Sequence, residues 1–276
     1  MIYIIFMCLC VIIYINNFII SKKNCCIICV NKTYRIRKDQ YYCFLMTSLL
    51  FLIAALRAPS VGFDTIHYCQ HFYNVCGESL KEIIQKYEEP GFYLLCKAIS
   101  TFSDNAQWML AVVGLIFTAA IGYFIYKYSS EYMASFLILI PFQFYSFSLT
   151  GLRQTLALSL VLYSYKYIEK KEFLKFTISI LVAMTFHYSA IFAFPLYFIY
   201  KFRINNLWRS VIVLMLPVLY IFRSSIIRYG LKYLYTDYNV YSDVQGSYVT
   251  FALYLAICII YKFVCDKKYD DGFEAI

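Results

Sequence analysis

The sequence carries little charge for its length. Only 15% of its 276 residues are Asp, Glu, Lys or Arg, whereas a soluble domain has about 25%. Hydrophobic residues make up 62%, and the mean hydropathy is +0.63. A folded chain of this size cannot hide so much apolar surface from water, because the buried fraction rises only slowly with length. The composition excludes a cytosolic enzyme, a secreted domain and a disordered chain, and it predicts a protein that uses lipid as its solvent.

Several signatures of soluble catalysis and metal binding are also missing. The sequence has no glycine-rich phosphate loop, nucleophile elbow or kinase motif set. Cys26 and Cys29 form a CxxC pair without a second pair, whereas a closed zinc site needs four ligands. His67 and His71 are spaced as zinc ligands on a helix, but Tyr68 stands where a metalloprotease has its glutamate. We therefore expect no metal, no cofactor and no nucleotide chemistry.

The apolar residues that are present gather in blocks long enough to form membrane-spanning helices, not in the alternating segments of a barrel. The blocks lie at residues 1–20, 41–56, 106–126, 133–149, 152–167, 173–200, 207–222 and 248–264. No internal repeat or linker divides them. We therefore predict an all-α fold, a polytopic transmembrane helical bundle of about eight spans that forms one membrane domain over residues 1–276.

Basic residues predict the orientation of this bundle. Most of them flank apolar blocks, so the net charge of +9 indicates membrane topology and not a nucleic-acid partner. Residues 21–40 carry six Lys and Arg against one acid, which places this segment and the C-terminal tail in the cytoplasm and the N-terminus outside. The block 173–200 is longer than one crossing and too short for two. If it returns to the side it left, 17 of the 25 basic residues are cytoplasmic, against 14 if it crosses once. We predict a re-entrant helical hairpin with His187 near its tip.

The longest polar segment, residues 58–105, is expected to be an extracytoplasmic loop. It contains six acidic residues against three lysines. Within it, Ser79 and Glu82 have the spacing of a capping box that begins a helix. The apolar residues that follow share one face, so we expect an amphipathic helix along the membrane surface. Pro90 and Gly91 are expected to end this helix.

Five polar residues reach the outer side in this topology although they are widely separated in the sequence. They are Arg57, Asp64, Glu89, Arg153 and His187. Ionisable side chains are costly in lipid, so those at membrane depth indicate function by default. Simpler roles stay open for three of them: Arg57 as a headgroup anchor, Asp64 as a helix cap and His187 as a core histidine.

An ordered set of short motifs carries a family resemblance. The set contains Arg57, Gly62-Phe63-Asp64-Thr65 with Tyr68, Glu89-Pro90-Gly91, Gly151-Leu152-Arg153-Gln154 and Phe186-His187-Tyr188-Ser189. Spread over roughly residues 40–200, it resembles the EpsG-like family of Wzy-type polysaccharide polymerases. The resemblance implies a multi-pass protein of the bacterial cytoplasmic (inner) membrane in exopolysaccharide or capsule synthesis. It also implies a polymerase that joins polyprenyl-pyrophosphate-linked oligosaccharide repeat units at the outer face of that membrane.

The substrate of such a polymerase suits the basic and polar residues of these motifs. The planar fork of an arginine binds phosphate oxygens well, so we expect Arg153 and Arg57 to hold the pyrophosphate. Gln154, Tyr68 and Thr65 complete the expected substrate-binding set. The lipid bilayer and other polysaccharide-synthesis membrane proteins are the further expected partners.

The attacking sugar hydroxyl needs a general base. Asp64, Glu89 and His187 are the candidate catalytic residues. We favour Asp64, because Gly62 allows a substrate to approach closely and Tyr68 lies one turn along the same helix.

Two other functions stay open. A transporter or flippase for the same lipid-linked sugar is one, although transporters often show inverted repeats and midplane charges that this sequence lacks. The other is a truncated, non-catalytic component of a polysaccharide synthesis complex, because members of the family usually continue through further spans whereas this chain ends at Ile276.

Overall fold

A computed structural model describes residues 25–29, 32–36, 38–200 and 206–222, with a few isolated positions between 225 and 259. The expected spans at 1–20 and 248–264 and the C-terminal tail fall outside these continuous ranges. The chain divides into two compact units, residues 1–200 and 201–276, which we describe separately.

The described part of the first unit is helical except for one hairpin. In the hairpin, β1 (Cys25–Cys29) pairs antiparallel with β2 (Lys32–Ile36). The helices are α2 (Lys38–Leu56), α3 (Thr65–Cys76), α4 (Leu80–Lys86), α5 (Pro90–Ser100), α6 (Ala106–Tyr128), α7 (Tyr132–Ile138), α8 (Phe144–Thr150), α9 (Leu152–Glu169), α10 (Phe173–Phe186), the 3-10 helix η1 (Tyr188–Ala193) and α11 (Leu196–Ile199). The all-helical expectation therefore holds for the described residues from 38 onward. The strands lie in the basic segment at residues 21–40, for which the sequence predicted a side of the membrane but no strands, and where Ile, Thr and Tyr residues favour extended structure.

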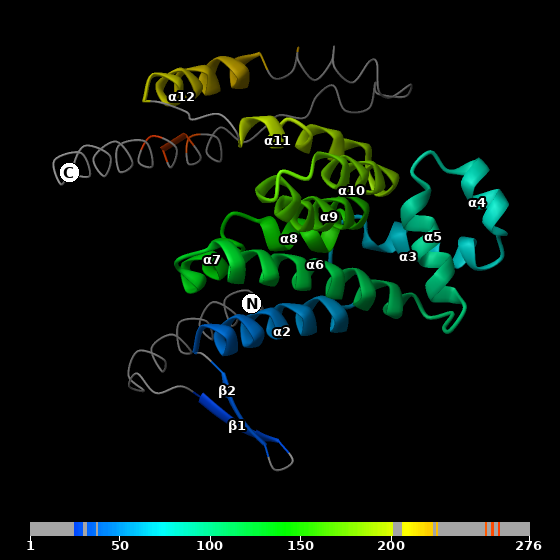
Figure 1. The fold of residues 1–276 in the computed structure, drawn as a ribbon. Helices are drawn as coiled ribbons and strands as arrows, with labels where there is room; N and C mark the ends of the chain where they lie inside the picture. Colours follow the sequence, from blue (N-terminus) through cyan, green and yellow to red (C-terminus); the bar gives the residue numbers. More distant parts are fainter. Residues whose placement is uncertain are drawn as a thin grey trace. The chain divides into compact units, whose positions relative to one another are not determined.

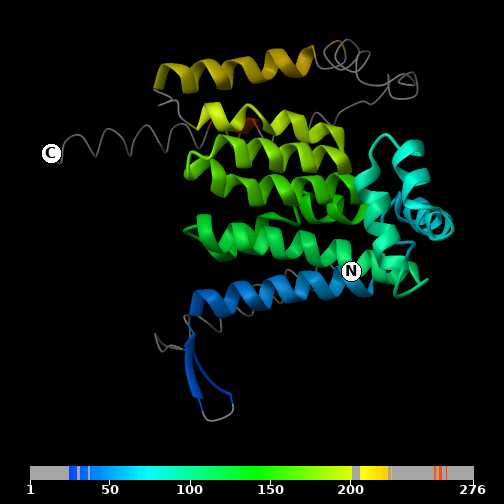
Figure 2. The same ribbon diagram turned by 45° about the vertical axis from the view of Figure 1, so that its right-hand side comes forward.

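Four helices of the first unit lie side by side in chain order. Figure 1 and Figure 2 show α2 against α6, α6 against α9, and α9 against α10. Small residues bring α2 and α6 close together. A Cβ on Gly114 would lie 2.8 Å from the Cβ of Ala54, and a Cβ on Gly122 would overlap the side chain of Thr47. Such contacts are typical of membrane helices, where small residues let two backbones approach each other.

The helix ends gather at two ends of the first unit: α2 and α10 run toward one of them, and α6 and α9 run away from it. At one end, called the site end below, α2 finishes and α6 begins: the side chain of Gln107 donates to the carbonyls of Ala55 and Arg57 at 2.5 and 3.1 Å. At the other end, called the opposite end, Lys127 of α6 pairs with Glu169 of α9 at 2.7 Å. Residues that are distant in sequence therefore meet at either end.

One helix of the described residues, α6, is long and apolar enough to cross a membrane. Its 23 residues rise about 35 Å at 1.5 Å per residue. The predicted spans at 41–56, 152–167 and 207–222 coincide with α2, α9 and, in the second unit, α12 (Asn206–Ile221). On α10 the side chains of Leu174, Ile178 and Leu181 share one face, and each is more than half exposed. The multi-pass arrangement of these helices stays a prediction.

The prediction of one continuous span at 133–149 is wrong. The structure has two short helices, α7 and α8, joined by residues 139–143. Pro141 has no N–H to donate and disfavours a helical backbone at Ile140. Gln143 then adopts a left-handed backbone with φ of 62° before α8 begins. A single apolar block therefore contains a break that hydrophobicity alone does not reveal.

The block 173–200 folds as the predicted helical hairpin. After α10 ends, His187 is extended, and η1 and α11 run back along α10. The ring of Tyr197 lies 5.0 Å from that of Phe173 and 5.4 Å from that of Phe176, both in the first turn of α10. His187 therefore lies at the tip of the hairpin, as predicted. That the hairpin re-enters the membrane stays a prediction.

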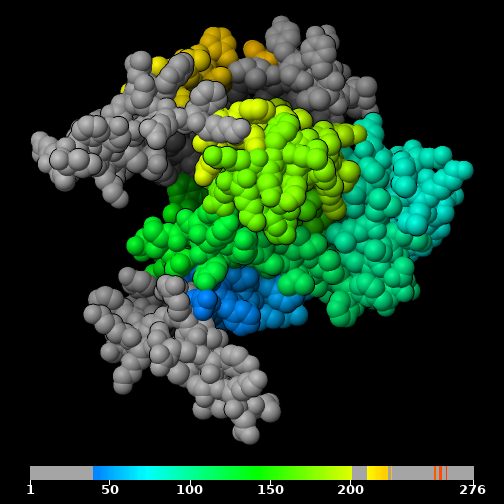
Figure 3. Space-filling view, in the orientation of Figure 1, coloured from blue at the N-terminus to red at the C-terminus, as the bar shows by residue number. Residues whose placement is uncertain are grey.

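Residues 58–105 form three short helices, not an open loop. The capping box before α4 is confirmed, since the Ser79 amide donates to the Glu82 carboxylate at 2.7 Å and the Glu82 amide donates back to the Ser79 hydroxyl. The prediction that Pro90 and Gly91 end this helix is wrong. α4 ends at Lys86, and Pro90 instead begins α5, where its missing N–H costs nothing. Figure 3 shows α3 to α5 (cyan) gathered beside the longer helices (green).

Candidate functional site

Glu89 is a buried carboxylate at the start of α5. Because proline disfavours a helical backbone at the residue before it, Glu89 lies outside the helix, with φ of −112° and ψ of 74°, as its N-cap. Its side chain makes no capping hydrogen bond, and only 7% of it is exposed. A charge this deeply buried is costly unless it is paired. Its partners come from two other elements, α9 and the hairpin tip.

Three residues contact the Glu89 carboxylate. Nη1 of Arg153 lies 3.0 Å from Oε2, and Nδ1 of His187 lies 3.0 Å from Oε1. The backbone N–H of Tyr188 donates to Oε1 at 2.7 Å. The Tyr188 hydroxyl also donates to the backbone carbonyl of Glu88 at 2.8 Å. We call Glu89, Arg153, His187 and Tyr188 the Glu89 cluster.

Close packing of two helix ends holds this cluster together. A Cβ on Gly91 would lie 2.5 Å from the hydroxyl oxygen and 2.9 Å from the backbone carbonyl of Thr185. Only a glycine therefore lets the first turn of α5 contact the last turn of α10. This contact brings the carboxylate of Glu89 to the hairpin tip.

The electrostatics of the cluster keep Glu89 ionised. Burial alone would raise its pKa, but the hydrogen bonds from His187 and the Tyr188 amide, together with the positive charge of Arg153, lower the pKa below its usual value. An ionised carboxylate can only accept hydrogen bonds, so Nδ1 of His187 carries the proton that faces it. Nε2 of His187 is then left for another partner.

Aromatic side chains surround Arg153. Tyr68 and Tyr93 interact with its guanidinium electrostatically, and the ring of Tyr68 packs edge-on against Phe92 at 5.2 Å. One third of the Arg153 side chain is exposed. Tyr68, predicted from the sequence to bind substrate, therefore lies beside the arginine predicted to hold the pyrophosphate.

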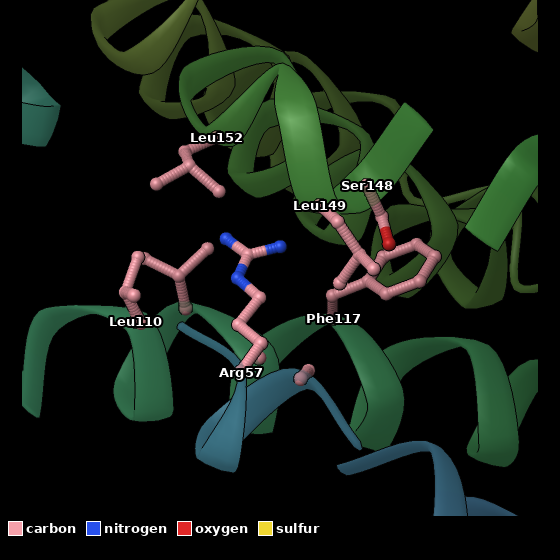
Figure 4. Close-up of a pocket in the computed structure, with 9 residues that line it drawn as sticks. Arg57, Leu110, Phe117, Ser148, Leu149 and Leu152 are labelled. Atoms are coloured by element: carbon pink, nitrogen blue, oxygen red, sulfur yellow. The ribbon is translucent and has the colours of Figure 1, made fainter. Parts of the chain in front are cut away.

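Arg57 lies in a separate pocket next to the cluster. It is 8% exposed, and its pocket is lined mainly by apolar residues of α6, α8 and α9. Figure 4 shows the guanidinium pointing from the end of α2 toward Leu149 and Leu152. Leu152 directly precedes Arg153, so α9 joins the two sites. An exposed headgroup anchor, the simpler role that the sequence left open for Arg57, does not agree with this burial.

Gly62 and Thr65 hold a loop against α8. Gly62 has φ of 100°, and a Cβ there would overlap the carbonyl of Leu149. The hydroxyl of the fully buried Thr65 lies 3.0 Å from the same carbonyl and 2.9 Å from that of Val61, and its one proton is shared between these two acceptors. The close approach that Gly62 permits is therefore to Leu149 within the chain. Contact of Thr65 with substrate stays a prediction.

Two further predicted residues lie apart from the Glu89 cluster. Asp64 precedes α3, makes no capping hydrogen bond and is partly exposed. Gln154 follows Arg153 on α9 but is exposed. Neither belongs to the contacts of the cluster, and their roles in catalysis and substrate binding stay predictions.

Sequence reasoning did not single out Tyr188 or Tyr93. Tyr188 contacts Glu89 through its backbone N–H, which carries no residue-type signal. Its position next to His187 in the last motif was the one available clue. Within the part of the chain that the structure describes, no three His, Cys, Asp or Glu side chains are grouped as metal ligands.

Comparison with known proteins gives one match. The EpsG family matches residues 40–274, which is most of the chain. No curated protein and no solved structure matches significantly. The family match agrees with the apolar α6 in indicating a membrane protein. The chain thus belongs to the EpsG family, and its role lies in polysaccharide synthesis.

Proposed function

We propose that this protein is a membrane glycosyltransferase that polymerises polyprenyl-pyrophosphate-linked oligosaccharide repeat units, and that the Glu89 cluster is its active site. The observation that carries the proposal is the buried carboxylate of Glu89 in contact with both Arg153 and His187. The cluster combines a phosphate-binding side chain with an oriented base, which are the two groups that this transfer needs.

Arg153 is the proposed ligand of the pyrophosphate. Its pair with Glu89 involves Nη1, and a third of the side chain is exposed. A guanidinium presents donors in a planar fork that matches phosphate oxygens. Arg57, in the neighbouring pocket, adds positive charge near the start of α9, where Leu152 lines that pocket.

His187 is the proposed general base. In the reaction, the acceptor hydroxyl oxygen forms a bond to C1 of the donor glycan while the bond from C1 to the phosphate oxygen breaks. Polyprenyl pyrophosphate leaves, and the hydroxyl proton goes to Nε2 of His187. Glu89 orients the ring through Nδ1 and stabilises the resulting imidazolium, as carboxylates do in other carboxylate–histidine pairs. Glu89 itself is a poor base, because its pKa is lowered. His187 is favoured over Asp64 because Asp64 stands outside the cluster.

The charge distribution supports an outward-facing site. The opposite end of the first unit carries five lysines, namely Lys127, Lys166, Lys170, Lys171 and Lys175. Basic residues that flank membrane helices favour the cytoplasmic side. The site end would then face outward, where a lipid-linked repeat unit would be joined.

The test uses purified protein and lipid-linked repeat units in detergent. Long chains formed without a membrane partition would support polymerisation and exclude transport as the explanation, whereas no chains from the wild type would contradict the proposal. His187→Gln should lower the rate on the order of 10²-fold. Asp64→Asn and the neighbouring control Glu88→Gln should retain most of the activity. Loss of activity in Asp64→Asn with an active His187→Gln would move the base to Asp64.

A further inference from the structure

We propose that the Glu89 carboxylate pairs with the guanidinium of Arg153 while substrate is absent. The pyrophosphate of the substrate then displaces this carboxylate from Arg153, and the carboxylate stays paired with His187. This inference rests on the proposed function. It adds a coupling between substrate binding at Arg153 and proton transfer to His187.

The carboxylate of Glu89 has one partner on α9 and two at the hairpin tip. Oε2 faces Nη1 of Arg153 at 3.0 Å. Oε1 accepts from the Tyr188 amide at 2.7 Å, and Nδ1 of His187 lies 3.0 Å from Oε1 and 3.2 Å from Oε2. The hairpin therefore retains the carboxylate through Tyr188 and His187 when Arg153 leaves Oε2. The exchange needs no movement of α5 or of the hairpin.

Exposure differs between the two partners in a way that favours this exchange. The side chain of Arg153 is 33% exposed, whereas that of Glu89 is 7% exposed. An incoming anion can reach the arginine, but the carboxylate cannot leave into water. A pyrophosphate carries more charge than a carboxylate and offers several oxygens to the guanidinium fork. It therefore competes directly for the group that Glu89 holds.

Displacement has a chemical consequence at the hairpin tip. Once Arg153 neutralises the pyrophosphate, the charge of Glu89 acts on His187 alone. A carboxylate that accepts from Nδ1 orients the ring and stabilises the positive charge that develops as Nε2 takes the hydroxyl proton. Binding of the donor thus activates the base that the acceptor requires. By linkage, the coupling is reciprocal.

The proposal predicts effects of opposite sign on binding and on turnover. Glu89→Gln removes the competing charge, so pyrophosphate should bind more tightly. The same change removes the carboxylate that supports His187, so polymerisation should slow. A residue that only supported the fold would weaken both.

The experiment measures binding of farnesyl pyrophosphate to the purified full-length protein in detergent by titration calorimetry. Glu89→Gln should bind about 5-fold or more tightly than wild type, while its polymerisation rate falls on the order of 10²-fold. Glu89→Asp keeps the charge but shortens the reach to Arg153, so it should also bind more tightly. Arg153→Lys should bind more weakly, and the control Glu88→Gln should match wild type.

The possible results separate this inference from the proposed function. Unchanged or weaker binding by both Glu89 variants, with weaker binding by Arg153→Lys, would overturn the exchange and leave the active-site assignment intact. Wild-type affinity in Arg153→Lys would show that the pyrophosphate is not held there, and both proposals would fail.

Discussion

Glu89 connects three elements through one carboxylate. It begins α5, pairs with Arg153 of α9 and accepts from the hairpin tip at His187 and Tyr188. Removing one partner of a buried charge pair typically costs about 3–5 kcal/mol, because the other charge is left uncompensated. The partial exposure of Arg153 lowers that figure here, since water can solvate the guanidinium.

The charge of Glu89 makes the stability of the cluster depend on pH. Its pKa is lowered in the folded protein, so the ionised form contributes stability above the unfolded-state value of about 4.3. That contribution is lost as the pH falls through the lowered folded-state value. We expect wild type to have a higher thermal midpoint than Glu89→Gln. This difference should have its largest value at pH 7 and should shrink below about pH 4. Unfolding in detergent at a series of pH values measures it, and a constant difference would contradict this role of the charge.

The geometry of Arg153 should matter beyond its charge. Arg153→Lys keeps the positive charge but loses the planar fork, so polymer yield in cells should fall about 10-fold or more. Lys127→Arg is the matched control, because Lys127 forms its ion pair with Glu169 at the opposite end. Polymer yield is compared at equal protein abundance. Wild-type polymer from Arg153→Lys would show that a point charge suffices.

At the scale of elements, the contact between α5 and α10 positions the site. Gly91→Ala should destabilise the protein by about 1–3 kcal/mol, because its Cβ would lie 2.9 Å from the backbone of Thr185, which cannot move freely. Gly77→Ala is the control, since nothing lies within 4 Å of a Cβ there. Thermal unfolding of the two variants in detergent compares them. Equal midpoints would argue that the two helix ends do not hold each other.

Much of this arrangement was predictable from the order of apolar blocks and basic residues. The block length at 173–200 and the count of basic residues predicted a hairpin with His187 at its tip, and the alternation of helices placed Glu89, Arg153 and His187 on one side. The break between α7 and α8 was missed, because hydrophobicity outweighed the signal of Pro141. Pro90 was interpreted as ending a helix when it begins one, since a proline marks a boundary without stating its direction.

The contacts within the cluster were less predictable than its membership. Tyr188 reaches Glu89 through a backbone amide, and the buried positions of Thr65 and Arg57 depend on how the loop at Gly62 packs on α8. Periodicity and motif spacing predict which side a residue reaches, but not which neighbour it touches there. Asp64 illustrates the limit, because Gly62 and Thr65 of the same motif pack against α8 while Asp64 stays partly exposed.

At the scale of the whole molecule, the orientation in the membrane determines which side the site faces. In a cysteine-free background, Ser79→Cys before α4 should be labelled by an impermeant thiol reagent in intact cells, because it lies at the site end. Lys170→Cys, at the end of α9 on the opposite end, should be labelled only after the membrane is permeabilised. The reverse pattern would place the Glu89 cluster in the cytoplasm.

The most direct test of the active-site assignment compares two carboxylates of the same protein. Glu89 pairs with Arg153 at the site end, and Glu169 pairs with Lys127 at the opposite end. Glu89→Gln and Glu169→Gln each remove one negative charge from an ion pair between helical elements. At matched protein abundance, we predict that polymer formation falls on the order of 10²-fold with Glu89→Gln and keeps its normal amount and length with Glu169→Gln. Normal polymer from Glu89→Gln, or an equal loss from both variants, would contradict the assignment.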